Sequence, residues 1–290
     1  MAGENNKMNE DTLEQGCLEW LAGLGYECVH GDDLSLGGSG EIRNRYSDVV
    51  LGSYLRRAIG RLNPDLSAFQ LEVVATKVAS YGSQSLIDGN KEVYDWLRNG
   101  VPLEVTEEDG RRTVRRVAVI DFAGRNELMA VRQLTIHGNK IRRPDIILFV
   151  NGLPLVVIEL KNPASLNADY EGAYNQIQTY KNDIPQLFYF NLLNVISDGT
   201  VARYGSLTAD LSRHSRWRLL GGKKVGAGQL ELEVLIRGLL DPSTLLTFFR
   251  GFVTYGGANG GATFKVIAQW HQFHGVNKAV ERAVDALLHQ

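Results

Sequence analysis

Apolar residues recur along this chain at two spacings, which predict helices in some stretches and strands in others. The run at 11–24 repeats every three or four residues and predicts a helix. Its buried face is expected to carry Leu13, Cys17, Leu21 and Leu24. Gly25 follows, and glycine commonly stops a helix. We therefore expect an amphipathic helix near the N-terminus.

The helical spacing continues through the first third of the chain. A short helix is predicted around 53–61, and two more are predicted within 67–98. Their expected buried residues are Leu71, Val74, Val78, Val93, Trp96 and Leu97. From 113 to 121 β-branched residues become frequent, which is typical of a strand, and 128–137 is a second candidate strand.

The stretch 140–163, KIRRPDIILFVNGLPLVVIELKNP, predicts a β-hairpin. Two short apolar runs flank Asn151 and Gly152, and this dipeptide is a strong short-range hairpin signal. Because side chains alternate along a strand, Glu159 and Lys161 point to one face. The other face, expected to enter the core, carries Val156, Ile158 and Leu160.

The length of the hairpin loop decides where Asp145 lies. With a regular two-residue loop, Asp145 would lie opposite Ile158 and face away from Glu159. A three-residue loop, or a bulge near Asp145, would place it opposite Glu159. Opposed Cβ atoms are ~4.5–5.5 Å apart, close enough for two carboxylates to share a metal ion. A working pair therefore requires the longer loop or a bulged hairpin.

The second half of the chain is expected to alternate helices and strands again. Pro163 ends the hairpin strand, and a helix follows over 169–182. Strands are expected at 186–197 and 201–206, on either side of a turn. A helix is expected over 239–255, then a flexible linker, GGANGGAT, and a final segment at 264–288 that carries a C-terminal helix.

Composition narrows the class of protein. The 290 residues are 44% hydrophobic and 22% charged, which is ordinary for a globular protein. The net charge of −2 means that any nucleic-acid contact must use local patches. Two cysteines, Cys17 and Cys28, form no disulfide framework or zinc pattern. No signal peptide or membrane-spanning run is visible, so we expect a cytoplasmic protein with no membrane partner.

Asp145, Glu159 and Lys161 suggest metal-assisted hydrolysis of a phosphodiester. Carboxylates are hard oxygen ligands that suit Mg²⁺, and a neighbouring lysine can stabilise charge in the transition state. Pro144-Asp145 followed by Glu159-x-Lys161 resembles the PD-(D/E)xK motif of a nuclease superfamily. The alternative is an edge hairpin in which Glu159 makes a surface salt bridge.

Longer stretches carry a closer resemblance. RYSDVVLGSYLRRAIGRLNPDL, RRPDIILFVNGLPLVVIELKNP, YNQIQTYKNDIPQLF and NVISDGTVARYGSL resemble the N-terminal region of type I restriction enzyme R subunits. This implies an α/β PD-(D/E)xK fold of the RecB-like branch, a central mixed sheet flanked by helices. It also implies an endonuclease domain over 1–250, followed at 251–290 by a linker and the helical lead-in to a missing helicase-like motor domain.

The resemblance assigns roles to individual residues. Asp145 and Glu159 would bind Mg²⁺, and Lys161 would complete the catalytic set. Gln176 and Tyr180 match a QxxxY motif and would support the site, while Glu14, with Glu10 as its rival, would approach the metal from the first helix. Gln272 matches a glutamine that recognises adenine in helicase-like proteins. Because 1–290 contains no G-x-x-x-x-G-K-[ST] loop, ATP is expected to serve only the full-length subunit.

The implied substrate is double-stranded DNA, cut at sites that this domain does not choose. Recognition would come from the methyltransferase (M) and specificity (S) subunits of the complex. Arg142 and Arg143 are candidates for phosphate contacts, whereas the arginines at 111–116 could equally be a solvated sheet edge. The histidines show no ligand spacing. Two other functions remain open, a stand-alone RecB-like repair nuclease and a non-catalytic DNA-binding scaffold.

Overall fold

A computed structural model describes residues 10–35, 43–107, 109–161, 170–226, 228–257 and 261–288. The helices are α1 (Glu10–Gly23), α2 (Gly52–Leu62), α3 (Ala68–Ala79), α4 (Leu86–Asn99), α5 (Tyr170–Asp183), η1 (Pro185–Tyr189), η2 (Leu211–Arg213), α6 (Glu231–Leu239), α7 (Pro242–Gly251) and α8 (Trp270–Leu288). The strands are β1 (Glu27–His30), β2 (Val101–Thr106), β3 (Arg112–Val117), β4 (Leu128–Arg132), β5 (Ile136–His137), β6 (Ile141–Arg142), β7 (Ile146–Val150), β8 (Leu153–Leu160), β9 (Leu193–Ser197), β10 (Ala202–Gly205), β11 (Leu219–Leu220), β12 (Lys223–Lys224), β13 (Val253–Gly256) and β14 (Phe264–Ile267).

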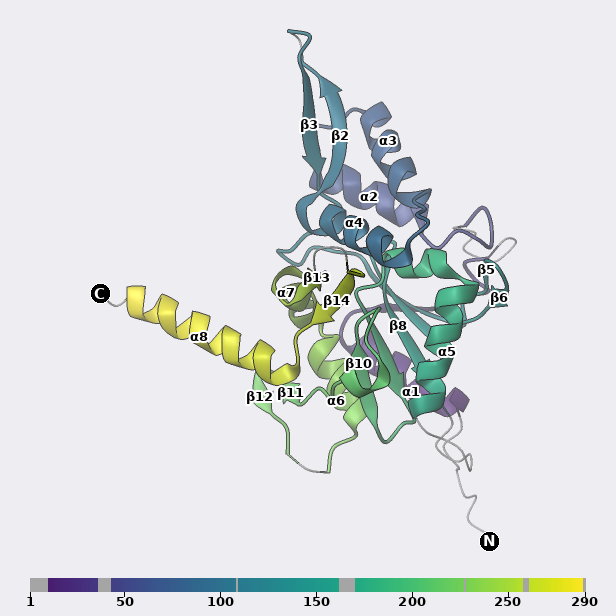
Figure 1. Ribbon diagram of the computed structural model, residues 1–290, viewed down its shortest axis with the longest axis vertical. Coiled ribbons are helices and arrows are strands. Elements are labelled where there is room, and N and C mark those ends of the chain that lie inside the picture. The colour runs from purple at the N-terminus through teal and green to yellow at the C-terminus, as the bar shows by residue number, and fades with distance from the viewer. Residues whose placement is uncertain are drawn as a thin grey trace.

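A six-stranded mixed sheet with the order β1-β4-β7-β8-β9-β10 forms the centre of the molecule. The β1–β4 and β8–β9 pairs are parallel, and the other neighbours are antiparallel. Helix α1 packs on β1, β4 and β8, and α5 packs on β8 and β9 (Figure 1). The β2–β3 hairpin projects from this body beside α2, α3 and α4. The expected α/β architecture, a mixed sheet flanked by helices, is confirmed.

Local sequence signals account for the helices of the first third. Ser67 and Gln70 form a capping box at the start of α3, in which each side chain accepts a hydrogen bond from the other residue's backbone N–H. Ser85 caps α4 by accepting from the N–H of Asp88. Gly25 follows α1 in the left-handed region, at φ +93°. The predicted helices at 11–24, 53–61 and 67–98 all form.

Two predicted strands are shorter than expected, one at its end and one at its start, where buried asparagines bond the backbone groups that a strand would use. Beyond β3, the amide of Asn63 pairs with both the N–H and the carbonyl of Ala118, so the strand predicted to reach 121 ends at Val117. Before β9, the side-chain NH₂ of Asn90 donates to the carbonyls of Phe188, Tyr189 and Asn191. The start of the strand predicted at 186–197 is therefore wrong, since 185–189 is a 3-10 helix.

The single helix predicted over 239–255 forms only from Pro242 to Gly251. Asp241 accepts a hydrogen bond from the N–H of Thr244 and starts α7, which ends at Gly251. The next residues form β13, which pairs with β14. That pairing joins residues on either side of the GGANGGAT stretch, of which 258–260 lie outside the described residues, so a local apolar pattern could not reveal it.

The β7–β8 hairpin has a two-residue loop and a bulge. Val150 pairs with Leu153, and Asn151 and Gly152 both have positive φ, +53° and +78°, as a tight hairpin turn requires. The register shifts by one residue beyond this point, which leaves Leu155 as the extra residue of β8. Of the two arrangements expected, the structure has the bulged hairpin, and its bulge lies near the turn rather than near Asp145.

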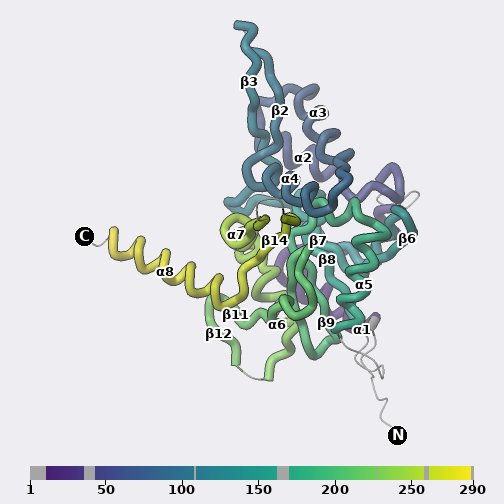
Figure 2. Tube along the Cα trace, viewed as in Figure 1, coloured from purple at the N-terminus to yellow at the C-terminus, as the bar shows by residue number. Residues whose placement is uncertain are grey.

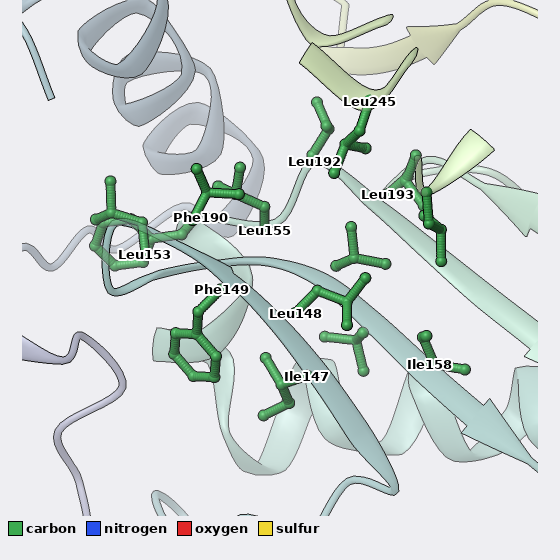
Figure 3. Close-up of a cluster of buried hydrophobic side chains, with 14 of the residues drawn as sticks. Ile147, Leu148, Phe149, Leu153, Leu155, Ile158, Phe190, Leu192, Leu193 and Leu245 are labelled. Carbon is green, nitrogen blue, oxygen red and sulfur yellow. The ribbon is translucent and has the colours of Figure 1, made fainter. Parts of the chain in front are cut away.

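Both faces of this hairpin are buried. Every residue of β7 and β8 is buried, so Glu159 lies in the interior and the edge-hairpin alternative is excluded. Figure 3 shows Leu148 of β7, Leu155 of β8, Leu193 of β9 and Leu245 of α7 in one hydrophobic cluster. The bulged residue, Leu155, is therefore held by core packing, which stabilises the shifted register.

The C-terminal segment begins on the body and then leaves it. Lys265 of β14 is buried, and its ammonium donates to the carbonyl of Asn191 and to Oδ1 of Asn90, at 2.6 and 3.1 Å. Helix α8 then runs away from the body as a single rod (Figure 2). The β13–β14 hairpin thus packs on the preceding residues, while the domain boundary expected at residue 250 stays a prediction. Within the described ranges, no helix combines the length and apolarity needed to cross a membrane.

Candidate active site

The bulge at Leu155 brings two carboxylates together. Beyond it, Ile146 pairs with Ile158, and continuing this register by one residue places Asp145 opposite Glu159. Both side chains are buried, with 5% and 2% of their surface exposed. The hairpin geometry that the sequence required for a shared site is therefore present, although the metal-binding roles themselves stay predictions.

Asp145 is held by the backbone of the strand that carries Glu159. Its Oδ2 accepts a hydrogen bond from the N–H of Leu160 at 2.7 Å, and its Oδ1 accepts from Nε2 of Gln133 at 3.2 Å. Burial, and then the charge of Glu159, raise the pKa of Asp145 to about 8. Two like charges in a buried site repel each other, so this arrangement favours either a proton or a bound cation.

Lys161 lies between this pair of carboxylates and the solvent. Its Nζ forms an ion pair with Oε1 of Glu159 at 2.9 Å, and 29% of its side chain is exposed. Its backbone N–H donates to the carbonyl of Ser197, which extends the pairing of β8 with β9. Lys161 is therefore anchored at its backbone, with an ammonium that touches a site carboxylate and also reaches solvent. Pro163 lies outside the described residues.

Helix α5 brings the predicted QxxxY pair to the same place. Tyr180 is buried, and its hydroxyl lies close to Glu159 and Gln176, which both influence its pKa. Burial, followed by the charges of Glu159 and Asp145, raises the pKa of Tyr180, so the hydroxyl stays protonated. Gln176 and Tyr180 are thus joined to the carboxylate pair, which is where the sequence placed them. The first residue of the predicted helix, Asp169, is outside the described residues.

Glu14 of helix α1 is connected to the site through Gln133, a residue that the sequence did not single out. Glu14 is buried, and its Oε1 accepts from Nε2 of Gln133 at 2.9 Å, the same nitrogen that donates to Asp145. Its Oε2 accepts from Arg132, which also pairs with Asp11. Glu14 therefore does approach the site, one amide away from Asp145. The side chain of its rival, Glu10, lies outside the described residues.

The basic residues near the site are engaged in ion pairs. Arg142 binds Asp183 of α5 through two nitrogens, at 2.5 and 2.7 Å. Arg143 pairs with Asp32 at 3.2 Å, and both of these side chains are well exposed. Upstream, Arg111, Arg115 and Arg116 pair with Asp109, Asp65 and Asp95. Arg143 is the more available of the two predicted phosphate contacts, because its ion pair is solvated.

Gln272 lies far along the chain from these residues, on α8. Its Oε1 accepts a hydrogen bond from the N–H of Gln269 at 2.8 Å, which caps the start of the helix. The side chain also lines a hollow of about 390 Å³ with Thr208 and Lys265. Adenine recognition by Gln272 stays a prediction. His271 and His274 lie on α8, as expected.

The donor set suits magnesium better than zinc. Among the described residues, no three His, Cys, Asp or Glu side chains are grouped to hold a metal ion, so the candidate site consists of the carboxylates of Asp145 and Glu159. Mg²⁺ is commonly held by one or two carboxylates together with substrate phosphate and water, whereas zinc sites use three or four protein ligands. Burial, and then the charge of Glu159, raise the pKa of Asp145, and a divalent cation held by the pair would favour the ionised carboxylates.

Comparison with known proteins places this chain in a family of restriction proteins. The family described as "Type I restriction enzyme R protein N terminus (HSDR_N)" matches residues 7–213, and the chain belongs to this family. The HindI type I restriction enzyme endonuclease subunit of Haemophilus influenzae is 40% identical over 284 residues, which are 96% of this chain and 27% of that protein. The MjaIXP protein of Methanocaldococcus jannaschii, provisionally named as the same kind of subunit, is 31% identical over 319 residues, 100% of this chain and 29% of that protein. The chain thus spans less than a third of these relatives.

Proposed function

We propose that the chain carries a Mg²⁺-dependent endonuclease that cleaves double-stranded DNA. The observation that carries this proposal is the bulged β7–β8 hairpin, which sets Asp145 opposite Glu159 with Lys161 on the latter's carboxylate. A hairpin without the bulge would send the two acids to opposite faces of the sheet. The family match and the names of the relatives support the same function.

The proposed chemistry divides among the residues of the site. Asp145 and Glu159 would hold the metal ion, which when bound would polarise the phosphate and acidify a water molecule. Lys161, with its ammonium partly in solvent, would donate to the phosphate oxygens as negative charge develops and would orient the attacking water. The Tyr180 hydroxyl would hold Glu159 in place.

The substrate would bind mainly through its phosphates. The chain has a net charge of −2, so DNA contact depends on local cations such as Arg143 and Lys161. Arg142 is occupied by the buried Asp183, so we propose that it braces α5 and that Arg143 contacts the phosphates. Cleavage would then occur at positions that this site does not select.

The larger role that we propose is the nuclease part of a type I R subunit. The relatives are more than three times as long as the aligned region, so ATP-driven translocation, with Gln272 recognising adenine, would belong to the full-length subunit. Partners would be the M and S subunits, and the protein would act in the cytoplasm. The family match favours this role over a stand-alone repair nuclease.

Nicking of supercoiled plasmid by the purified chain tests the activity. We expect nicking in the presence of Mg²⁺ or Mn²⁺, none in EDTA, and a loss of at least about a hundredfold in Lys161→Ala, since the ammonium acts in the transition state. Lys91→Ala, which changes an exposed lysine of α4, is the matched control and should nick normally. Equal nicking by a folded Lys161→Ala would overturn the proposal. Metal binding without nicking by the wild type would favour the scaffold function.

A further inference from the structure

Gln133 occupies an unusual position beside the proposed metal site. It follows the last residue of β4 and adopts φ +56°, a left-handed conformation that costs energy for a residue other than glycine. Such strain persists only where surrounding contacts maintain it. The contacts that hold Gln133 in this conformation therefore indicate its role.

Three backbone contacts hold Gln133 in this conformation. Its N–H donates to the carbonyl of Asp145 at 2.9 Å, and its carbonyl accepts from Nε of Arg143 at 3.0 Å. Gly31 packs directly against it, and a Cβ at Gly31 would lie 2.5 Å from the Gln133 carbonyl oxygen. The left-handed turn thus ties β1, β4 and the start of β7 together at the edge of the site.

The side chain of Gln133 bridges two acids. Its Nε2 donates to Oε1 of Glu14 at 2.9 Å and to Oδ1 of Asp145 at 3.2 Å. Both bonds start at the same nitrogen, so the amide uses both hydrogens of its NH₂ group. Each acid has a further donor on its other oxygen, Arg132 for Glu14 and the Leu160 N–H for Asp145. Gln133 is the link that connects α1 to the carboxylate on β7.

We propose that Gln133 is a positioning residue that orients Asp145 for metal binding and couples it to Glu14. The proposal rests on the function proposed above. Asp145 has no other side-chain donor among the hydrogen bonds seen in the described residues, so its rotation about the Leu160 N–H bond is limited chiefly by this amide. Loss of such an outer partner typically weakens metal binding ~10–100-fold.

Two substitutions distinguish the effect of the Gln133 amide on metal binding from the effect of the strained backbone. Gln133→Leu removes the amide but keeps a side chain of similar size in the left-handed conformation. Gln133→Gly removes the amide and also relieves the strain, because glycine adopts φ > 0 freely. If the amide positions Asp145, both variants lose metal affinity, although Gln133→Gly keeps its backbone conformation at no steric cost. Gln186→Leu is the matched control, since Gln186 donates one hydrogen bond, to the carbonyl of His137, away from the site.

The experiment is Mn²⁺ titration by calorimetry on the 290-residue chain, with unfolding midpoints measured in EDTA. We expect Gln133→Leu and Gln133→Gly to bind Mn²⁺ about tenfold or more weakly, and Gln186→Leu to bind within about twofold of wild type. Plasmid nicking by the two Gln133 variants should recover at saturating Mn²⁺, because the amide acts through metal binding and not on the phosphate.

The outcomes distinguish this proposal from the one on which it rests. Wild-type affinity in a Gln133→Gly protein that melts like the wild type would overturn the role of Gln133 and leave the nuclease proposal standing. A Gln133 variant that binds Mn²⁺ weakly but still nicks DNA slowly at saturating Mn²⁺ would also overturn this role. Gln133 would then act on the reaction itself. If the wild-type chain neither binds Mn²⁺ nor nicks DNA, both proposals fail together.

Discussion

At the scale of single residues, the site is defined by which polar groups are buried and what they touch. Asp145, Glu159 and Tyr180 lie in an interior made mostly of aliphatic side chains. Lys161 contacts Oε1 of Glu159 and Gln133 contacts Oδ1 of Asp145, which replaces part of the water that these carboxylates would otherwise bind. Burial of this kind creates the pKa shifts of the site and makes single substitutions informative.

Asp145→Asn should stabilise the metal-free protein at neutral pH. The folded-state pKa of Asp145 is raised from 3.8 to about 8, so between these values the folded state binds more protons than the unfolded state and stability falls as pH rises. Asparagine carries no charge and keeps a carbonyl oxygen for the Leu160 N–H. We expect the variant to gain on the order of 2 kcal/mol at pH 7 and to lose this advantage below about pH 4.

Urea denaturation in EDTA at several pH values measures this effect. Asp145→Asn should also lose Mn²⁺ binding, a result that would show that the stabilising substitution removes a metal ligand. A variant that is less stable than wild type at pH 7, or a gain that is independent of pH, would contradict the burial of an ionisable carboxylate.

Tyr180→Phe isolates the hydroxyl that contacts Glu159. The ring remains in the core, so we expect a loss of only about 1 kcal/mol in the free energy of unfolding. Because the hydroxyl lies beside Glu159 and would orient its carboxylate, Mg²⁺-dependent nicking should fall about tenfold. Tyr81→Phe is the control, since the Tyr81 hydroxyl also donates to a carboxylate, that of Glu92, at an exposed position. Equal effects of the two substitutions on nicking would argue against a role for Tyr180.

At the scale of elements, the β7–β8 hairpin depends on its turn as much as on its strands. Asn151 is fully buried, and its NH₂ donates to the carbonyl of Val119 and to Oδ1 of Asn126. Its Oδ1 accepts from the N–H of Glu127 at 2.9 Å. The carbonyl of Gly152 accepts from the N–H of Leu51. The turn is thus hydrogen-bonded to two other loops, the connection 118–127 and the residue before α2, and the hairpin cannot change register without breaking these bonds.

Asn151→Gly tests this fastening. Glycine tolerates the positive φ of the turn, so the substitution removes only the side-chain hydrogen bonds and leaves buried partners without them. We expect the free energy of unfolding to fall by about 2–4 kcal/mol, measured by urea denaturation. Asn139→Gly, at an exposed asparagine with one hydrogen bond, should cost less than about 1 kcal/mol. Similar losses in both variants would show that the Asn151 side chain contributes little.

At the scale of the whole molecule, the described chain combines a compact α/β body with two projections, the β2–β3 hairpin and α8 (Figure 1). The body contains every residue of the proposed catalytic set. Gln272 lies on α8, the helix that extends from the body (Figure 2). Nuclease chemistry and nucleotide recognition are therefore expected to be separable in this chain.

The 290-residue chain should cleave DNA without ATP and should show no DNA-stimulated ATPase. ATP hydrolysis needs a phosphate-binding loop with its lysine and a Ser or Thr for Mg²⁺, and 1–290 has no such pattern. DNA binding should be weak and should decline steeply between 50 and 200 mM salt, about as expected for a few phosphate contacts. Phosphate release measures the ATPase, with Lys161→Ala as the background preparation. A filter-binding titration over salt concentration measures DNA binding. Steady ATP turnover above that background would contradict the prediction.

The sequence by itself determined the helices of the first third, the β7–β8 hairpin and the residues of the candidate site. Those features rest on local physics, namely apolar periodicity, capping residues and an Asn-Gly turn, which act within a few residues of one another. The spacing of Asp145, Glu159 and Lys161 also limited the hairpin to a long loop or a bulge, and the structure has the bulge.

Only the tertiary structure decided features that depend on residues distant in the chain. The ends of β3 and β9 follow from the side chains of Asn63 and Asn90, and β13 forms because it pairs with β14. The bulge is held by packing of Leu155 in the core, and the role of Gln133 arises because α1, β4 and β7 meet at one edge of the sheet. No local pattern encodes these contacts, because their free energy is gained only once the separate elements have packed together.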